Sequence, residues 1–222
     1  VRQSIYYPAK EEKIPLLIGL LRRTEARRTL VFTNTRRSAE RLEHVLRANG
    51  FEAQAISGDV PQTKRLKFLR EFHDGELAVL IGTDVASRGL HIPDVSHVFN
   101  YDLPQDPADY VHRIGRTARA GAEGDAISFA CEEYAISLPD IEHYLGHKIP
   151  AVAIAPDLLS DSVVASGTMQ GDRPGGSGGR GGRGGRPGGG GRPGGGGRPG
   201  GGRGHGGRPA PHRGHSGHRT GR

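Results

Sequence analysis

TLVFTNTRRSAERLEHVLRANGFEAQAI, residues 29–56, holds two short apolar runs with a longer, mostly polar segment between them. The runs Thr29–Thr33 and Glu52–Ile56 are rich in β-branched and apolar residues, which is typical of strands. Between them, Arg36–Ala48 carries apolar side chains at helical spacing, and Gly50 follows where a left-handed helix terminus is expected. A strand, a helix and a strand in this order predict two parallel strands joined by a crossover helix.

The same alternation continues over the first 150 residues. Strands are expected at Ser4–Tyr7, Thr29–Thr33, Glu52–Ile56, Ala78–Gly82, His97–Tyr101 and Asp125–Ala130. Further helices are expected at Pro61–His73, from Pro107 onward with Asp106 as its cap, and at Glu132–Leu145 with Ile136 pointing inward. This order predicts an α/β fold with a parallel sheet flanked by helices.

Composition divides the chain into a folded domain at residues 1–150, an extension or linker at 151–170 and a tail at 171–222. The tail holds 26 of the 37 glycines and 11 arginines but a single acid, whereas residues 1–170 are slightly acidic. Such a segment cannot bury enough apolar surface to offset its chain entropy, which predicts a disordered tail that binds polyanions. Residues 151–170 keep apolar side chains without a clear period, so a packed strap and a flexible linker both fit.

Several classes of protein are not supported by the sequence. Cys131 is the single cysteine, which excludes an intrachain disulfide, fits a cytoplasmic protein and is expected to be buried. The longest apolar stretch, Ile14–Leu21, falls short of the about 20 residues of a membrane span, and no signal peptide is recognisable, so no membrane partner is expected. Because the chain begins at Val1 and its only methionine is Met169, we expect a fragment of a longer protein.

Residues 110–121, YVHRIGRTARAG, carry the strongest chemical signal. Arg113, Arg116 and Arg119 recur at every third position with no acid between them. Guanidinium groups at this spacing can converge on one phosphate whose negative charge grows during transfer. A solvated basic helix end fits the spacing alone equally well.

This segment resembles motif VI of superfamily 2 helicases, and three further segments match in order. Residues 30–35 (LVFTNT) resemble motif IV, residues 57–65 resemble the segment with a QxxR pair, and residues 80–89 (LIGTDVASRG) resemble motif V. Together they are similar to DEAD-box RNA helicases over residues 1 to about 150, which implies a RecA-like C-terminal domain. The chain has no GxxxxGK[ST] loop and no DEAD-type acidic motif. The resemblance therefore implies that an N-terminal RecA-like domain holds ATP and Mg²⁺, and that this fragment alone is inactive.

The resemblance also implies roles for individual residues toward the nucleotide. Arg116 and Arg119 match the arginines that reach the γ-phosphate of ATP, while His112 and Arg113 match positions that couple the two domains. Asp84, Arg88 and Gly89 form the motif V turn beside the nucleotide; a capping or core histidine at position 112 and ordinary turn residues are the structural alternatives. No metal ligands are expected, because the histidines at 205, 212, 215 and 218 are irregularly spaced.

For RNA, the resemblance implies contacts to the sugar-phosphate backbone without base reading. The matching residues are Thr33, Asn34, Gly58, Gln62, Arg65 and Thr83. The alternative for Arg65 is an exposed arginine of an amphipathic helix. Two positions depart from the family: His91 stands where many members have an aspartate near the ribose, and Ala118 replaces a common glycine, a change expected to cost little.

Three short segments, at 88–93, 130–135 and 144–150, narrow the resemblance to the DEAD-box helicases of the bacterial RNA degradosome. This implies RNA degradation as the process, with a segment of RNase E docking around Leu138–Pro150. The tail resembles RGG-type RNA-binding segments but lacks their aromatic residues, so salt-sensitive binding is expected. A catalytically inactive RNA-binding adaptor and a DNA-directed superfamily 2 enzyme are the alternatives.

Overall fold

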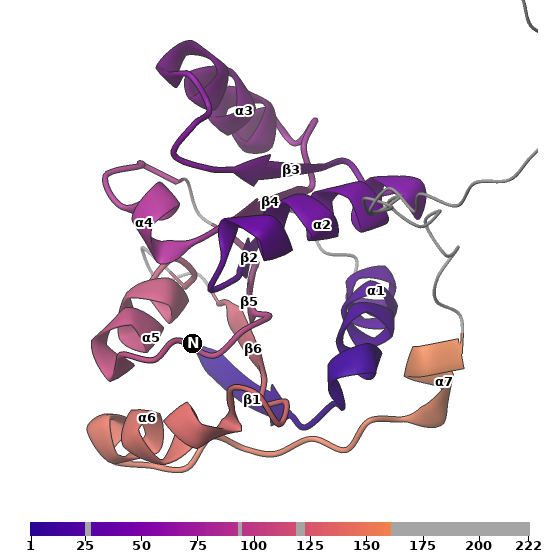
Figure 1. The fold of residues 1–222 in the computed structure, drawn as a ribbon, viewed down its shortest axis with the longest axis vertical. Coiled ribbons are helices and arrows are strands. Elements are labelled where there is room, and N and C mark those ends of the chain that lie inside the picture. Colours follow the sequence, from indigo (N-terminus) through magenta and orange to yellow (C-terminus); the bar gives the residue numbers. More distant parts are fainter. Residues whose placement is uncertain (25–27, 93–94, 119–122, 161–222) are drawn as a thin grey trace, which may run out of the picture. The chain divides into compact units, whose positions relative to one another are not determined.

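The computed structural model describes residues 1–24, 28–92, 95–118 and 123–160 (Figure 1). Six parallel strands form one sheet in the order β1-β6-β5-β2-β4-β3. The strands are β1 (Arg2–Tyr6), β2 (Thr29–Phe32), β3 (Ala53–Ile56), β4 (Val79–Gly82), β5 (His97–Asn100) and β6 (Asp125–Phe129). The predicted strands and the α/β class are therefore confirmed, with strand ends shifted by one or two residues. Residues 161–170 and the tail lie outside the described residues.

Helices cover both faces of the sheet. They are α1 (Lys13–Arg23), α2 (Arg36–Ala48), α3 (Gln62–Asp74), α4 (Asp84–Ser87), α5 (Pro107–Ile114), α6 (Leu138–Leu145) and α7 (Pro156–Ser160), with the short 3-10 helices η1 (Lys10–Glu12) and η3 (Ala135–Ser137). The side chains of β2 alternate between the two faces: Val31 packs with α1 and α2, whereas Leu30 and Phe32 pack with the side chains of Phe72 and Ala86. Because both faces are covered, all four residues of β2 are buried. Among the described residues, we find no helix that is both long enough and apolar enough to cross a membrane.

The predicted helix signals mostly hold. Helix α2 has the expected bounds, and Gly50 behind it adopts the expected left-handed conformation, with φ of +86°. At the start of α5, the backbone N–H of Ala108 donates to Asp106 Oδ1 at 2.8 Å, so Asp106 is the cap. Cys131 is buried, as expected.

The helix predicted at Glu132–Leu145 ends at Leu145 as expected, and Ile141 is buried as predicted, but its start is wrong. The helical segment begins at Ala135, and its first turn, η3, is a 3-10 turn that leads into α6. Pro139 stands in the first turn of α6, where a backbone N–H has no partner within the helix, so the proline suits a helix start at this point. With the helix starting at Ala135, the Ile136 side chain is 84% exposed, contrary to the prediction that it points inward.

Helices α1 and α7 were not predicted. Pro15 lies in the first turn of α1, where a backbone N–H has no partner within the helix, so it does not break the helix. At Gly19 the helix packs closely against α7, because a Cβ there would lie 2.2 Å from the Leu158 carbonyl oxygen. Residues 151–160 thus pack as a strap: Ala151 bridges to Ile5 and Leu158 is buried in the core.

Candidate functional site at the carboxyl edge of the sheet

The functional motifs meet because three strands end side by side. Phe32, the last residue of β2, pairs in register with Gly82 of β4 and Asn100 of β5. The loops that follow these strands therefore leave the sheet at one edge, where open α/β sheets place their ligands. Motif IV, motif V and the residues before α5 are brought together there, although they lie far apart in the sequence.

Arg113 is the centre of this edge. Its side chain is 1% exposed, and its guanidinium lies over the Phe32 ring at 5.0 Å. Nε and Nη2 donate to the two carboxylate oxygens of Asp84 at 2.8 and 2.6 Å, and Nη2 also donates to Asn34 Oδ1 at 3.0 Å. Nη1 donates to the Asp102 carbonyl at 2.6 Å and to Asn100 Oδ1 at 3.5 Å. All five N–H donors are used inside the domain, so Arg113 holds motifs IV, V and VI together.

A second ion pair supports the same edge. Lys13 Nζ donates to Asp102 Oδ1 at 2.5 Å, and the two side chains are only 4% and 3% exposed. The other carboxylate oxygen of Asp102 accepts from the backbone N–H of Asn34 at 2.9 Å, while Asn34 Nδ2 donates to the Leu103 carbonyl at 2.8 Å. Asn34 is thus fixed on both sides.

Sequence reasoning missed Lys13 and Asp102. The available signals were a carboxylate directly behind a strand that ends at the ligand edge, and a lysine at the start of an apolar run. Neither signal indicates which residue it pairs with, because the two residues are 89 positions apart.

A pocket of about 300 Å³ lies beside Arg113. It is lined by Phe32, Asp84, Ser87, Arg88, Gly89, Asp109, His112, Arg113 and Arg116. Every residue predicted to face the nucleotide is therefore brought to one place, except Arg119, which lies outside the described residues.

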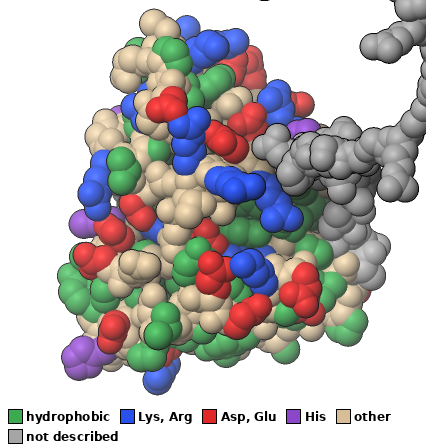
Figure 2. Space-filling view, in the orientation of Figure 1, with side chains coloured by type: hydrophobic (Ala, Val, Ile, Leu, Met, Phe, Trp, Pro, Cys, Tyr) green, Lys and Arg blue, Asp and Glu red, His purple; other side chains and the backbone are tan. Residues whose placement is uncertain are grey.

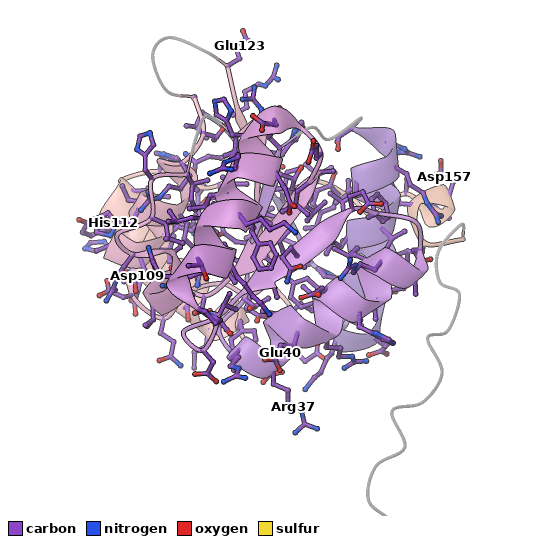
Figure 3. All side chains as sticks on the ribbon, turned by 90° about the horizontal axis from the view of Figure 1, so that it is seen from above. Arg37, Glu40, Asp109, His112, Glu123 and Asp157 are labelled. Atoms are coloured by element: carbon purple, nitrogen blue, oxygen red, sulfur yellow. The ribbon has the colours of Figure 1, made fainter. Side chains whose placement is uncertain are left out.

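Asp109 organises the open side of this pocket. Arg88 Nη2 donates to Asp109 Oδ1 at 3.1 Å, and His112 Nδ1 lies 3.9 Å from the same oxygen. Figure 3 shows Asp109 and His112 projecting from α5 on the same side of the domain. His112 is 74% exposed, so it is neither a buried core histidine nor a member of the Arg113 network.

The residues predicted to contact RNA fall into two groups. Arg65 Nη2 donates to the Ala86 carbonyl at 3.2 Å, and Thr83 Oγ1 accepts from the Ala86 backbone N–H at 3.3 Å, so both meet the turn of α4. Gly58 and Gln62 are exposed before and at the start of α3. These four residues can share one ligand surface.

The second group supports that surface from inside the domain. Thr33 is fully buried, and its hydroxyl donates to the Thr35 carbonyl at 3.0 Å. Asn34 is half-buried, with its amide engaged by Arg113 and Leu103. The structure thus does not place the Thr33 side chain on the surface, and direct RNA contact through its hydroxyl is not what this geometry offers.

The two departures from the family pattern differ in weight. His91 is exposed. Ala118 has φ of +55°, in the left-handed region, where a residue with a Cβ costs roughly 1 kcal/mol relative to glycine. The expectation that this replacement costs little stays a prediction, and the backbone conformation explains why glycine suits the position.

Comparisons with known proteins agree with this geometry. Residues 12–121 match the helicase conserved C-terminal domain. The ATP-dependent RNA helicase RhlB of Xanthomonas axonopodis pv. citri is 58% identical over 160 residues, covering 72% of this chain and 28% of that protein. RhlB of Shewanella halifaxensis is 52% identical over 163 residues, covering 73% of this chain and 37% of that protein. The chain thus spans about a third of the length of these relatives.

Solved structures show the same domain. The DEAD-box protein SrmB of E. coli, in its complex with the regulator of ribonuclease activity A, is 38% identical with a TM-score of 0.68, and 75% of this chain covers 98% of that one. The C-terminal domain of the DEAD-box protein Dbp5 is 34% identical with a TM-score of 0.63, covering 68% and 89% of the two chains. The RecA-like fold inferred from the motifs is therefore confirmed, and the chain belongs to the DEAD-box helicase family as an RhlB-like helicase C-terminal domain.

Proposed function

We propose that this chain is the C-terminal half of an ATP-dependent RNA helicase that closes on an N-terminal RecA-like domain and locally unwinds RNA duplexes. The observation that carries the proposal is the pocket in which the motif V turn lies beside Arg116 of motif VI, on a scaffold fixed by Arg113 and Asp84. An adaptor that only binds RNA has no need for this convergence.

On the nucleotide side, the cations of the pocket fit a polyphosphate. Arg116 is half-buried in the pocket wall, and Arg88 lies at its open side. Bound ATP, with its Mg²⁺ on the partner domain, would supply the phosphoryl group. Arg116, together with Arg119, would stabilise the charge that develops there, a contribution typically of about 10³ to 10⁵ in rate. His112 would contact the partner domain at the pocket's open side, and Asp84 would keep Arg113 in place.

On the RNA side, Arg65 and Thr83 at the α4 turn, with Gly58 and Gln62, would hold the sugar-phosphate backbone of a single strand. A structure of yeast Dbp5 that is 34% identical to this chain contains RNA and ADP BeF3, which supports an RNA ligand for this fold. Residues 171–222, with their 11 arginines, would tether RNA near this surface and raise its effective concentration.

The narrower setting is proposed from the likeness to RhlB: RNA degradation in the cytoplasm, with a segment of RNase E docked around Leu138–Pro150. This surface exposes Tyr144 at 61% and Ile136 at 84%, two large apolar side chains that a partner could cover. Its backbone is well supported, because Glu142 accepts from Lys148 Nζ at 2.7 Å and from the Ile149 backbone N–H at 3.0 Å. Although burial opposes ionisation, these two contacts lower the pKa of Glu142.

RNA-stimulated ATP turnover tests the proposal. The chain is mixed with a separately produced N-terminal RecA-like domain of RhlB, and native protein is compared with Arg116→Ala/Arg119→Ala. Turnover should appear on mixing and fall by about 10³-fold or more in the double variant. Arg22→Ala/Arg47→Ala, which removes two exposed arginines outside the pocket, is the matched control and should retain turnover. RNA binding without turnover, or turnover indifferent to the pocket arginines, would support the adaptor instead.

A further inference from the structure

A second cleft, of about 340 Å³, lies between the start of α1 and the first half of α2, away from the pocket beside Arg113. In Figure 2, basic side chains border a recessed apolar area on this face, between the positions of α2 and α1. Its α2 wall carries Arg37 and Arg41, and Ile14, Leu42 and Tyr101 contribute apolar surface. None of the six residues predicted to bind RNA lines it.

The α2 wall is electrostatically unfavourable when empty. Arg37 and Arg41 are like charges one helical turn apart, both exposed, and within the described residues neither has an ion-pair or hydrogen-bond partner from its side chain. They stand in the first two turns of α2, where the helix dipole is positive, and the first turn contains no acid. An anionic group in the cleft would offset all three effects. Figure 3 shows Arg37 extending away from α2, which leaves its guanidinium accessible to a ligand.

The floor of the cleft is apolar and aromatic. Tyr101 is nearly buried and Tyr134 is half-buried, and burial raises the pKa of both phenols, that of Tyr134 to about 12. Both therefore stay neutral, and with Ile14 and Leu42 they form a surface suited to a bulky apolar side chain. The ligand that fits the cleft combines negative charge with an apolar group.

The opposite wall distinguishes a peptide from a nucleic acid. Glu11 and Glu133 line the cleft on the α1 side, and Lys10 is paired with Glu133 at 2.9 Å. A polyanion filling the cleft would meet these carboxylates, whereas a peptide can place its acids against Arg37 and Arg41 alone. We propose that this cleft docks an acidic segment of a protein partner, with one bulky apolar residue against Ile14, Leu42 and Tyr101.

A partner bound in this cleft would contact residues that support the carboxyl edge of the sheet, where the motifs meet. Lys13 and Asp102 also line the cleft, and Asp102 holds the backbone of Asn34 and, through its carbonyl, Arg113. A partner seated in the cleft would thus contact the ion pair on which motifs IV and VI depend. The docking itself does not rest on the proposed helicase function.

Photocrosslinking of a defined probe to the full chain tests the proposal. The probe is the fluorescein-labelled peptide Asp-Glu-Phe-Asp-Glu-Leu-Asp, with p-benzoylphenylalanine in place of Phe for crosslinking. Crosslinks are expected within residues 10–14, 35–42, 101–102 or 133–134, located by mass spectrometry. Arg37→Ala/Arg41→Ala should weaken binding about tenfold, and the control Arg22→Ala/Arg47→Ala, which removes the same charge outside the cleft, by less than about twofold.

Three results would overturn the proposal. The first is crosslinking confined to residues 171–222, which would assign the binding to the basic tail. The second is equal weakening in both double variants, or no crosslink in the cleft at millimolar peptide. The third is a labelled decauridine that loses affinity in Arg37→Ala/Arg41→Ala while the peptide does not, which would make the cleft a nucleic-acid site.

Discussion

Arg113 and Arg65 are both arginines of helicase motifs, but the fold treats them in opposite ways. Arg113 is buried and uses all five donors on groups of its own domain. Arg65 is half-exposed, and one Nη2 contact ties it to the Ala86 carbonyl; its Nε is buried and has no hydrogen-bond partner among the described residues. The difference shows that one arginine belongs to the scaffold that shapes the site, while the other is only partly held by its own domain and is expected to reach a ligand through its guanidinium Nη groups.

The comparison predicts its largest effect at Arg113. Arg113→Met leaves Asp84 and Asn34 without their partner, and removing one member of a buried ion pair costs about 3 to 5 kcal/mol. Urea unfolding followed by circular dichroism measures this loss. Arg113→Lys keeps the charge but cannot copy the fork of contacts, so it should fall between the native protein and Arg113→Met. A loss below about 1 kcal/mol in Arg113→Met would mean that Arg113 is not part of the scaffold.

A double-mutant cycle at Lys13 and Asp102 sharpens the same side of the comparison. Each of Lys13→Met and Asp102→Asn leaves a buried group unpaired, so the two losses should not add. The coupling free energy should be about 1 to 3 kcal/mol, measured from urea unfolding of the native protein, both single variants and the double variant. Additive losses would show that the 2.5 Å contact contributes no coupling.

A substitution of Arg65 tests the other half of the comparison, the arginine that is expected to contact RNA. Arg65→Ala should weaken binding of single-stranded RNA by about tenfold while changing the unfolding free energy by less than about 0.5 kcal/mol. Lys67→Ala on the same helix is the matched control, since Lys67 is exposed and pairs with Glu71 at 3.4 Å. Fluorescence anisotropy with labelled RNA gives the affinities. If both variants weaken RNA binding equally, Arg65 contributes only as one positive charge among others on a basic helix face.

The sequence predicts one side of this comparison better than the other. Strands and helices follow from local patterns, so β1 to β6, α2 and α5 could be predicted closely. Motif residues expected to face a ligand could be named because the resemblance to a known family identifies them. The residues that support the site could not be predicted. Lys13 pairs with Asp102, and Gly19 packs against Leu158, only because the sheet order brings distant segments together. The local sequence around each residue does not indicate which distant residue it will contact.

Thr33 shows the same limit within a recognised motif. Its position in motif IV predicted an RNA contact, but the last residue of β2 is followed by a turn that buries Thr33 and points its hydroxyl at Thr35. Whether a motif residue touches a ligand or holds a neighbour that does depends on side-chain direction. That direction is set by tertiary packing and not by spacing.

The smallest expected effect concerns the backbone behind the motif VI arginines. Ala118→Gly relieves the left-handed strain at φ of +55°, which costs roughly 1 kcal/mol, and should stabilise the domain by up to about 0.5 kcal/mol after the greater chain entropy of glycine in the unfolded state is deducted. Gly75→Ala is the mirror-image control: its φ is +81° and a Cβ there meets nothing within 4 Å, so it should destabilise through backbone strain alone. Thermal unfolding of both variants measures the pair. If Ala118→Gly stabilises the domain and Gly75→Ala destabilises it, the backbone at Ala118 is strained. If both variants destabilise the domain, the Ala118 side chain makes contacts that outweigh its backbone strain.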